Sequence, residues 1–258
     1  MPLDAILFDL GGTLIEYAGP YHTWPDLETP GFTAAYRILT EHGVTLPEYD
    51  AFQAAGFAHL PGRWQRATTG ERNLRLVDLL EEVLLEFGVN SFAPDWLEAA
   101  AEAYQDAVCA QAYVVPGAQE TLAALKECNF KLGLLSNTMF TGVAHRSDLA
   151  RFGLADFFDA MLFSADVNKW KPNPEPFLHL LEELQVEPSA AVYIGDDPAA
   201  DVAGGQRAGM RTIHFQSSQR FPTPDGIIPD ARIDKLPELL TLLQNWPDAD
   251  MDNRCPDH

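Results

Sequence analysis

Basic residues are scarce in this chain. It has 17 lysines and arginines against 38 aspartates and glutamates, giving a formal net charge of −21 over 258 residues, and no lysine precedes Lys126. A field of this sign repels nucleic acid and anionic membrane surfaces, so we expect neither as a partner. The same field opposes an anionic substrate, so a phosphate site would need local cations or a metal.

Long apolar runs and paired cysteines are also missing. No segment approaches the ~20 apolar residues that span a bilayer, and a strand pattern begins almost at the first residue, so we expect neither a membrane span nor a signal peptide. The cysteines are Cys109, Cys128 and Cys255, an odd and sparse set without metal-ligand spacing. We therefore expect a reducing cytoplasm rather than a disulfide framework.

Short apolar runs alternate with helical patterns through most of the chain. Strands are predicted at residues 5–8, 132–135, 160–163, 191–194 and 212–215. Helices are predicted at residues 118–127, 174–184 and 198–208. The apolar runs are too short to be helices, and continuous apolar runs of this length are typical of buried parallel strands. Their alternation with helices implies right-handed crossovers. The pattern predicts an α/β fold, a Rossmann-like parallel sheet with helices on both faces.

Residues 15–113 break this rhythm and predict an inserted all-helical domain, which separates two core segments, 1–14 and 114–246. Within the insert we expect one helix from Thr29 to Gly43 and two more at residues 71–87 and 94–112. The remaining residues, 247–258, are rich in proline and aspartate, and we expect them to be disordered.

Polar residues follow three of the predicted strands. Asp9, Ser136 and Asp196 each come at the point where a strand ends. Parallel strands bring their carboxyl ends to one edge of the sheet, where open sheets bind ligands. Two carboxylates at that edge would repel one another without a cation between them. The sequence therefore predicts a metal-assisted site there.

Four motifs occur in a fixed order along the chain. They read FDLGGTL at 8–14, LLSNT at 134–138, KPNPEPF at 171–177 and IGDDPAAD at 194–201. In order and spacing they resemble the motifs of the haloacid dehalogenase-like superfamily, over the whole chain except the tail. The resemblance implies that the helical insert is a cap over the active site. It also implies a magnesium-dependent hydrolase, most simply a phosphatase of a small phosphorylated metabolite.

The resemblance assigns roles to individual residues. Asp9 is the nucleophile that attacks phosphorus, and Ser136 and Lys171 hold the transferring group. Asp9 and Asp196, with the backbone carbonyl of Gly11, would coordinate Mg²⁺, which prefers hard oxygen ligands of this kind.

Further candidates have a functional and a purely structural interpretation. These are Gly12, Thr13, Asn137, Asp197 and Asp201. In the family pattern the first three contact the phosphate, and one of the two aspartates pairs with the lysine when the site is empty. Alternatively, the glycine and threonine only form a tight turn, and the asparagine and Asp197 only cap helices.

One position departs from the family pattern. Family phosphatases usually have a second aspartate two residues after the nucleophile, where it acts as general acid and then as base, but here the residue is Gly11. Losing such assistance typically costs ~10²–10⁴-fold in rate. A phosphatase would then need a substrate with a good leaving group, or an acid from the insert, for which His22, Tyr21 and Glu16 are candidates.

Other activities in the family also lack this aspartate. Phosphonatases need a lysine in the cap, and none precedes Lys126, which excludes them. A 2-haloacid dehalogenase-like hydrolase and a catalytically weak phosphate-binding protein stay open. For substrate recognition, residues 60–70 are expected to form a loop whose Arg63, Trp64 and Arg66 bind an anion or a flat group, with an exposed solvated loop as the alternative.

Overall fold

The computed structural model describes residues 2–21, 23–216, 221–246 and 249–255. Its centre is a parallel sheet of six strands in the order β5-β4-β1-β6-β7-β8. The strands are β1 (Ala5–Phe8), β4 (Lys131–Ser136), β5 (Ala160–Phe163), β6 (Ala191–Gly195), β7 (Arg211–Phe215) and β8 (Ala231–Ile233). The α/β prediction and its five strands are confirmed. The edge strand β8 was not predicted, because three residues carry too short a pattern.

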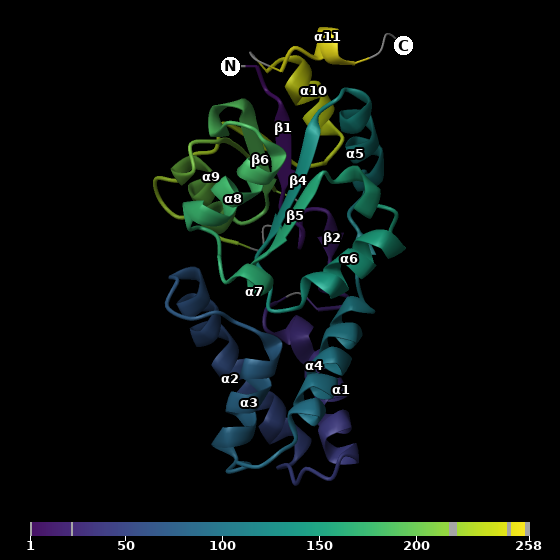
Figure 1. Ribbon diagram of the computed structural model, residues 1–258, viewed down its shortest axis with the longest axis vertical. Helices are drawn as coiled ribbons and strands as arrows, with labels where there is room; N and C mark the ends of the chain where they lie inside the picture. The colour runs from purple at the N-terminus through teal and green to yellow at the C-terminus, as the bar shows by residue number, and fades with distance from the viewer. Residues whose placement is uncertain (1, 22, 217–220, 247–248, 256–258) are drawn as a thin grey trace.

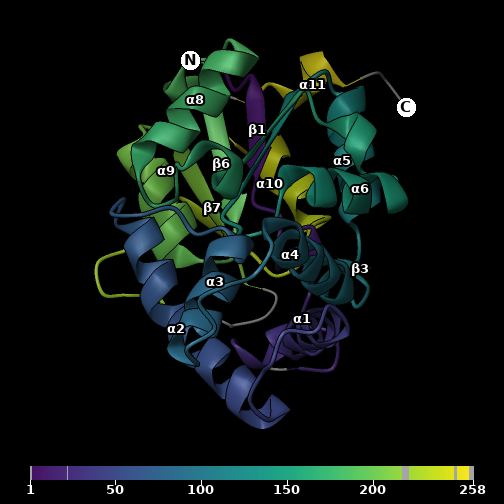
Figure 2. The ribbon, with the colours of Figure 1, turned by 60° about the horizontal axis from the view of Figure 1, so that its bottom comes forward.

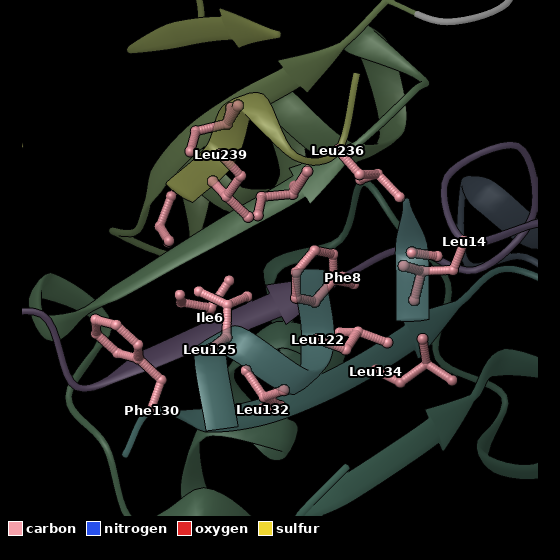
Figure 3. Packing of buried hydrophobic residues seen from close by; sticks show 14 of the residues in the cluster. Ile6, Phe8, Leu14, Leu122, Leu125, Phe130, Leu132, Leu134, Leu236 and Leu239 are labelled. Atoms are coloured by element: carbon pink, nitrogen blue, oxygen red, sulfur yellow. The ribbon is translucent and has the colours of Figure 1, made fainter. Parts of the chain in front are cut away.

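Helices cover both faces of the sheet, and alternate residues of β1 show why. Ile6 and Phe8 point to one side, against Leu122 and Leu125 of α5 (Figure 3). The other two residues of the strand face the opposite cluster, which contains side chains of α8. In Figure 1, α8 and α9 lie on one side of the sheet, and α5 and α6 lie on the other. The continuous apolar strands are therefore buried on both faces, as expected for a parallel sheet.

The core helices lie between or after these strands. They are α5 (Ala118–Glu127), α6 (Gly142–Arg151), α7 (Ser164–Val167), α8 (Pro174–Leu184), α9 (Ala203–Arg207), α10 (Glu238–Gln244) and α11 (Met251–Arg254). A π-helix, Pro198–Val202, precedes α9, and short 3-10 turns cover Asp26–Glu28, Ala155–Phe157 and Pro188–Ala190. The predicted helix at 198–208 is thus formed by two pieces of five residues each, a π-helix and an α-helix.

Four helices form a second body beside the carboxyl edge of the sheet (Figures 1 and 2). They are α1 (Thr29–Glu41), α2 (Tyr49–Thr68), α3 (Leu76–Glu86) and α4 (Pro94–Cys109), and residues 26–109 are called the helical insertion below. The short antiparallel strands β2 (Ile15–Glu16) and β3 (Tyr113–Val114) pair where the chain leaves and re-enters the core. The insertion has its own buried cluster, separate from the two clusters that flank the sheet.

Helix α2 covers residues 60–68 of the segment 60–70, where a loop was predicted, so that prediction is wrong for all but the last two residues. Proline and glycine there suggested a break, and Pro61 does lie inside the helix. Packing outweighs the local preference, because Leu60 is fully buried. Gly56 has a packing role, since a Cβ atom there would lie 2.0 Å from the ring of Phe32.

The tail is also more ordered than expected. Ala249 and Met251 are buried, Arg254 forms an ion pair with Asp4, and a disulfide joins Cys128 to Cys255. The predictions of disorder and of no disulfide are therefore wrong for residues 249–255. Residues 247–248 and 256–258 lie outside the described residues.

The sparse cysteines no longer argue for a reducing compartment, so cytoplasmic location stays a prediction. Among the helices of the described residues, none is long and apolar enough to cross a membrane.

Candidate active site

Three strand ends bring polar side chains into one buried cavity. Asp9 follows β1, Ser136 ends β4 and Asp196 follows β6, and each side chain lines the cavity. The two flanking strands pair with β1 in register, which places the three positions at the same edge of the sheet. All three residues are at least nine-tenths buried. This edge is where a ligand would meet them.

Lys171 lies at the centre of the polar network. Its Nζ donates hydrogen bonds to Asp9 Oδ1 at 2.7 Å and to Asp201 Oδ1 at 2.7 Å. It also donates to the Tyr193 hydroxyl at 2.9 Å and to the carbonyl of Leu135 at 3.2 Å. Burial alone would lower the pKa of Lys171, but the two carboxylates outweigh that effect and raise it well above its usual value. The lysine is therefore a fixed cation beside Asp9.

The acidic side chains form a cluster that fits a divalent cation. One carboxylate oxygen from each of Asp9, Asp196 and Asp201 lies within 4.8 Å of the others. Asp201 is already bonded on both oxygens, accepting from Lys171 Nζ on one and from the Asp197 backbone N–H at 2.9 Å on the other. Burial raises its pKa, and the lysine ammonium opposes that rise. The geometry therefore favours Asp9 and Asp196 as metal ligands and Asp201 as the partner of the lysine.

Asn137 bonds to the backbone around the lysine. Its Oδ1 accepts a hydrogen bond from Lys171 N at 2.8 Å, and its Nδ2 donates to Lys171 O at 2.9 Å. Thr13 Oγ1 donates to Asp9 Oδ2 at 3.2 Å. Asp197 caps the following turn by accepting from the backbone N–H of Ala199 at 2.8 Å. These three side chains position the site through other residues.

The two glycines after Asp9 have different environments. Gly12 has a φ of +85°, which an L side chain rarely adopts. A Cβ atom at Gly11 would meet one neighbour within 4 Å, the Tyr17 ring at 3.8 Å. The position where the family pattern has an acid thus has room for a Cβ atom beside the cavity.

A second group of lining residues had not been expected from the sequence, apart from Trp64. The cavity measures about 300 Å³, and one wall comes from residues 17–28, α2, α4 and the turn after β4. The apolar and aromatic members are Tyr17, Trp24, Leu27, Trp64, Val108, Met139, Phe140 and Phe221. These residues are scattered over the sequence, so no local pattern indicates that they meet. The cavity thus combines a charged end with a largely apolar one.

Glu28 is the one acidic residue in the apolar wall among the lining residues that the structure describes. It is 6% exposed, and the Tyr104 hydroxyl donates a hydrogen bond of 3.0 Å to its Oε2. Burial raises the pKa of Glu28 to about 7. A buried carboxyl group facing a cavity is a functional candidate that the sequence motifs did not indicate.

His145 connects the wall to the turn after β4. Its Nε2 lies 2.7 Å from Thr138 Oγ1, and its Nδ1 lies 3.0 Å from the Tyr17 hydroxyl. The ring stacks between Phe140 and Phe163. Burial lowers the pKa of His145 to about 4, so the ring is neutral near neutral pH and adds no cation to the cavity.

Comparison with known proteins decides the family. The profile of the haloacid dehalogenase-like hydrolases matches residues 3–209. The chain belongs to this family. All four sequence motifs fall inside the match, and the last two strands, β7 and β8, and the tail fall outside it. The resemblance that the motifs suggested is therefore confirmed.

Relatives with known names include two phosphatases. A ribulose-1,5-bisphosphate 5-phosphatase of Halopiger xanaduensis is 30% identical over 252 residues, 93% of this chain and 98% of the relative. A glyceraldehyde 3-phosphate phosphatase of Methanopyrus kandleri is 32% identical over 182 residues, 64% of this chain and 77% of the relative. A crystal structure of a 2-haloacid dehalogenase from Pseudomonas syringae has a TM-score of 0.68 at 27% identity and covers 95% of this chain and 99% of that one.

Some candidates lie apart from the cavity of this hydrolase. Arg63 is 2% exposed and donates a hydrogen bond of 2.6 Å to Glu82, so it links α2 to α3 inside the insertion. Trp64, from the same predicted loop at residues 60–70, lines the cavity. Arg63 and Arg66 are not among the described lining residues. The same is true of two proposed acid donors, Glu16 and Tyr21. The third, His22, lies outside the described residues.

Proposed function

We propose that this hydrolase is a magnesium-dependent phosphatase that acts on a small phosphorylated metabolite through an aspartyl-phosphate at Asp9. The observation that carries the proposal is the contact of Lys171 Nζ with both Asp9 and Asp201. A buried ammonium beside the nucleophile offers a fixed positive charge to a phosphoryl group. It also offsets part of the repulsion that the acidic surface exerts on an anion.

In the proposed first step, an Asp9 carboxylate oxygen attacks phosphorus while the bond to the leaving oxygen breaks. Lys171 and Ser136 bind the equatorial oxygens of the transferring group. Asp9 and Asp196, with the carbonyl of Gly11, would hold Mg²⁺, which when bound screens the charge between the nucleophile and the phosphate. Water then attacks phosphorus, which releases phosphate and restores the Asp9 carboxylate.

The leaving oxygen receives no proton from position 11, because Gly11 has no side chain. A leaving group that is stable as an anion avoids this need. We therefore infer that the preferred esters have acidic leaving groups, such as phenols or acids, and that poor alkyl leaving groups react slowly.

We also infer that the helical insertion acts as a cap, with core segments 1–14 and 114–246 and a cap of residues 15–113. The support is its contribution to the cavity, which includes Glu28, Trp64 and Val108. Charge in the transition state would then develop in a cavity that the cap shields from water.

The test is phosphate release from a panel of esters, with magnesium or with a chelator. Activity should require magnesium and disappear in Asp9→Asn, while Asp50→Asn, an exposed change at the start of α2, should leave it intact. Activity that survives in Asp9→Asn would overturn the assignment of Asp9 as the nucleophile.

Carbon–halogen hydrolysis is the second candidate, favoured by Gly11 and by the dehalogenase-named structure. It predicts halide release from 2-haloacids in the presence of chelator. The acidic cluster of Asp9, Asp196 and Asp201 supports the phosphatase over this alternative, because halide displacement needs no cation. Phosphate binding without release from any ester would instead support a catalytically weak binding protein.

A further inference from the structure

The charges around the cavity divide it into two unlike ends. Among the described lining residues Lys171 is the one lysine or arginine, and it is bonded to Asp9 and Asp201 at the phosphate end. At the other end the wall offers aromatic and aliphatic surface with Glu28. None of the described lining residues at that end would offer a positive side chain to a leaving group with a second phosphate or a carboxylate. Such a group would lose its hydration without compensation.

Glu28 needs a partner that the described residues do not provide. It is 6% exposed, and its hydrogen bonds come from neutral groups, the Tyr104 hydroxyl and the side chain of Trp24. Within the described part of the chain no lysine or arginine forms an ion pair with it. Burying a carboxylate without a cation is costly, which is why its pKa rises to about 7. A positively charged ligand would remove this cost and favour the ionised carboxylate.

Two indole rings border the same end of the cavity. Trp24 and Trp64 both line it, with ring centroids 5.9 Å apart and planes inclined by 58°. Trp64 is held from behind by an edge contact with Trp170 at 5.2 Å. Indole faces attract cations more strongly than the other aromatic side chains do, and the attraction grows where water is excluded. Rings and carboxylate together favour an organic cation over a neutral group of equal size.

We propose that this end of the cavity is a subsite for a leaving group that carries an ammonium group, held by Glu28 and by the rings of Trp24 and Trp64. The inference rests on the proposed phosphatase activity and names its substrate class: phosphate monoesters whose alcohol or phenol bears an amine. The phosphoryl group would face Lys171 and Asp9 while the ammonium group lies in the insertion side of the cavity.

The test compares three phenyl phosphates of similar size and leaving-group acidity. Their para substituents are aminoethyl (tyramine phosphate), ethyl and carboxyethyl. For the wild type we expect kcat/KM to be roughly tenfold higher for tyramine phosphate than for the ethyl ester, with the carboxyethyl ester lowest. Glu28→Gln should remove the preference. Glu41→Gln, an exposed change at the end of α1, should retain it.

Three results would overturn the subsite. These are equal rates on the three esters, a preference that survives in Glu28→Gln, and an equal loss of rate on all three esters in that variant. The last result would assign Glu28 to proton transfer.

Binding of the free phenols tests the subsite without turnover. Quenching of the indole fluorescence of the folded wild type measures the affinity for tyramine and for para-ethylphenol. Tyramine should bind roughly tenfold more tightly. Equal binding would overturn the subsite even if no ester were hydrolysed. Tight tyramine binding without hydrolysis would instead overturn the proposed phosphatase and retain the subsite.

Discussion

In the proposed mechanism Gly11 limits which leaving groups the enzyme can expel, and the space around it makes this testable. An added Cβ there meets Tyr17 at 3.8 Å, an ordinary contact, so the backbone at position 11 has room for a Cβ atom. Gly11→Asp should therefore restore a general acid, and we expect turnover of alkyl phosphates to rise by roughly 10- to 100-fold. Aryl phosphates should change little, because their leaving groups need no proton.

Steady-state rates on paired alkyl and aryl esters check this prediction. Gly11→Asn is the matched control, since it fills the same space without an acidic proton. A rise on both ester classes, or an equal rise in the asparagine variant, would show that protonation is not what position 11 lacks.

Glu28 and His145 give opposite pH dependences to stability. The pKa of Glu28 rises from 4.5 to about 7, so its contribution is complete below 4.5 and is lost as pH rises toward 7. The pKa of His145 falls from 6.5 to about 4, so its contribution is complete above 6.5 and is lost as pH falls toward 4. Each slope approaches about 1.4 kcal/mol per pH unit, and the two oppose one another between 4.5 and 6.5.

Single substitutions should separate these contributions. Between pH 4.5 and 6.5, the free energy of unfolding of His145→Gln should fall relative to the wild type as pH rises. That of Glu28→Gln should rise relative to the wild type over the same range. Urea unfolding at several pH values measures both. Curves that run parallel to the wild type would contradict the buried states of these two groups.

Residues in motifs were predictable from the sequence, and residues of the cavity wall were not. Asp9 and Asp196 follow buried strands, so local pattern and sheet geometry together place them at one edge. Glu28, Tyr17 and His145 come from separate segments and meet only after the insertion packs against the core. Their burial, which shifts the pKa of each, is a property of that packing alone.

At the level of elements, Asn137 ties the end of β4 to the segment that carries Lys171. Its amide bonds to both the N–H and the carbonyl of that residue. Asn137→Ala should let the lysine shift relative to Asp9, and a displacement of about 1 Å can cost roughly 100-fold in rate. We expect kcat to fall by about 10- to 100-fold, with a smaller change in KM.

Initial-rate kinetics with two further variants check this role. Asn137→Asp keeps the acceptor for Lys171 N but loses the donor, so it should lie between the alanine variant and the wild type. Asn90→Ala, at an exposed loop position, should match the wild type. A change in KM alone would indicate that Asn137 binds substrate directly.

Elements with a strong apolar period were predicted well, and those stabilised mainly by packing were not. The strands β1 and β5 and the helices α5 and α8 have the expected bounds. Helix α2 was missed because its glycines and Pro61 favour a break, while burial against its neighbours and the Arg63–Glu82 ion pair stabilise it as a helix. Neither contact is visible from local sequence.

At the scale of the whole molecule, the disulfide between Cys128 and Cys255 fixes the end of the chain to the core. A crosslink across a long loop restricts the unfolded chain, and removing one typically costs about 2–4 kcal/mol. Cys255→Ser should lower the free energy of unfolding by that amount. Reductant should destabilise the wild type to the level of the variant and leave the variant unchanged. Thermal unfolding that is insensitive to reductant would contradict the crosslink.

The central claim is the covalent intermediate on Asp9, and an acid quench during turnover tests it most directly. Mass spectrometry of the digested protein should find a phosphoryl group on the peptide that contains Asp9 when wild type turns over an aryl phosphate with magnesium. The Asp9→Asn protein should show none. Rapid phosphate release by the wild type with no phosphoryl group on that peptide would contradict the account.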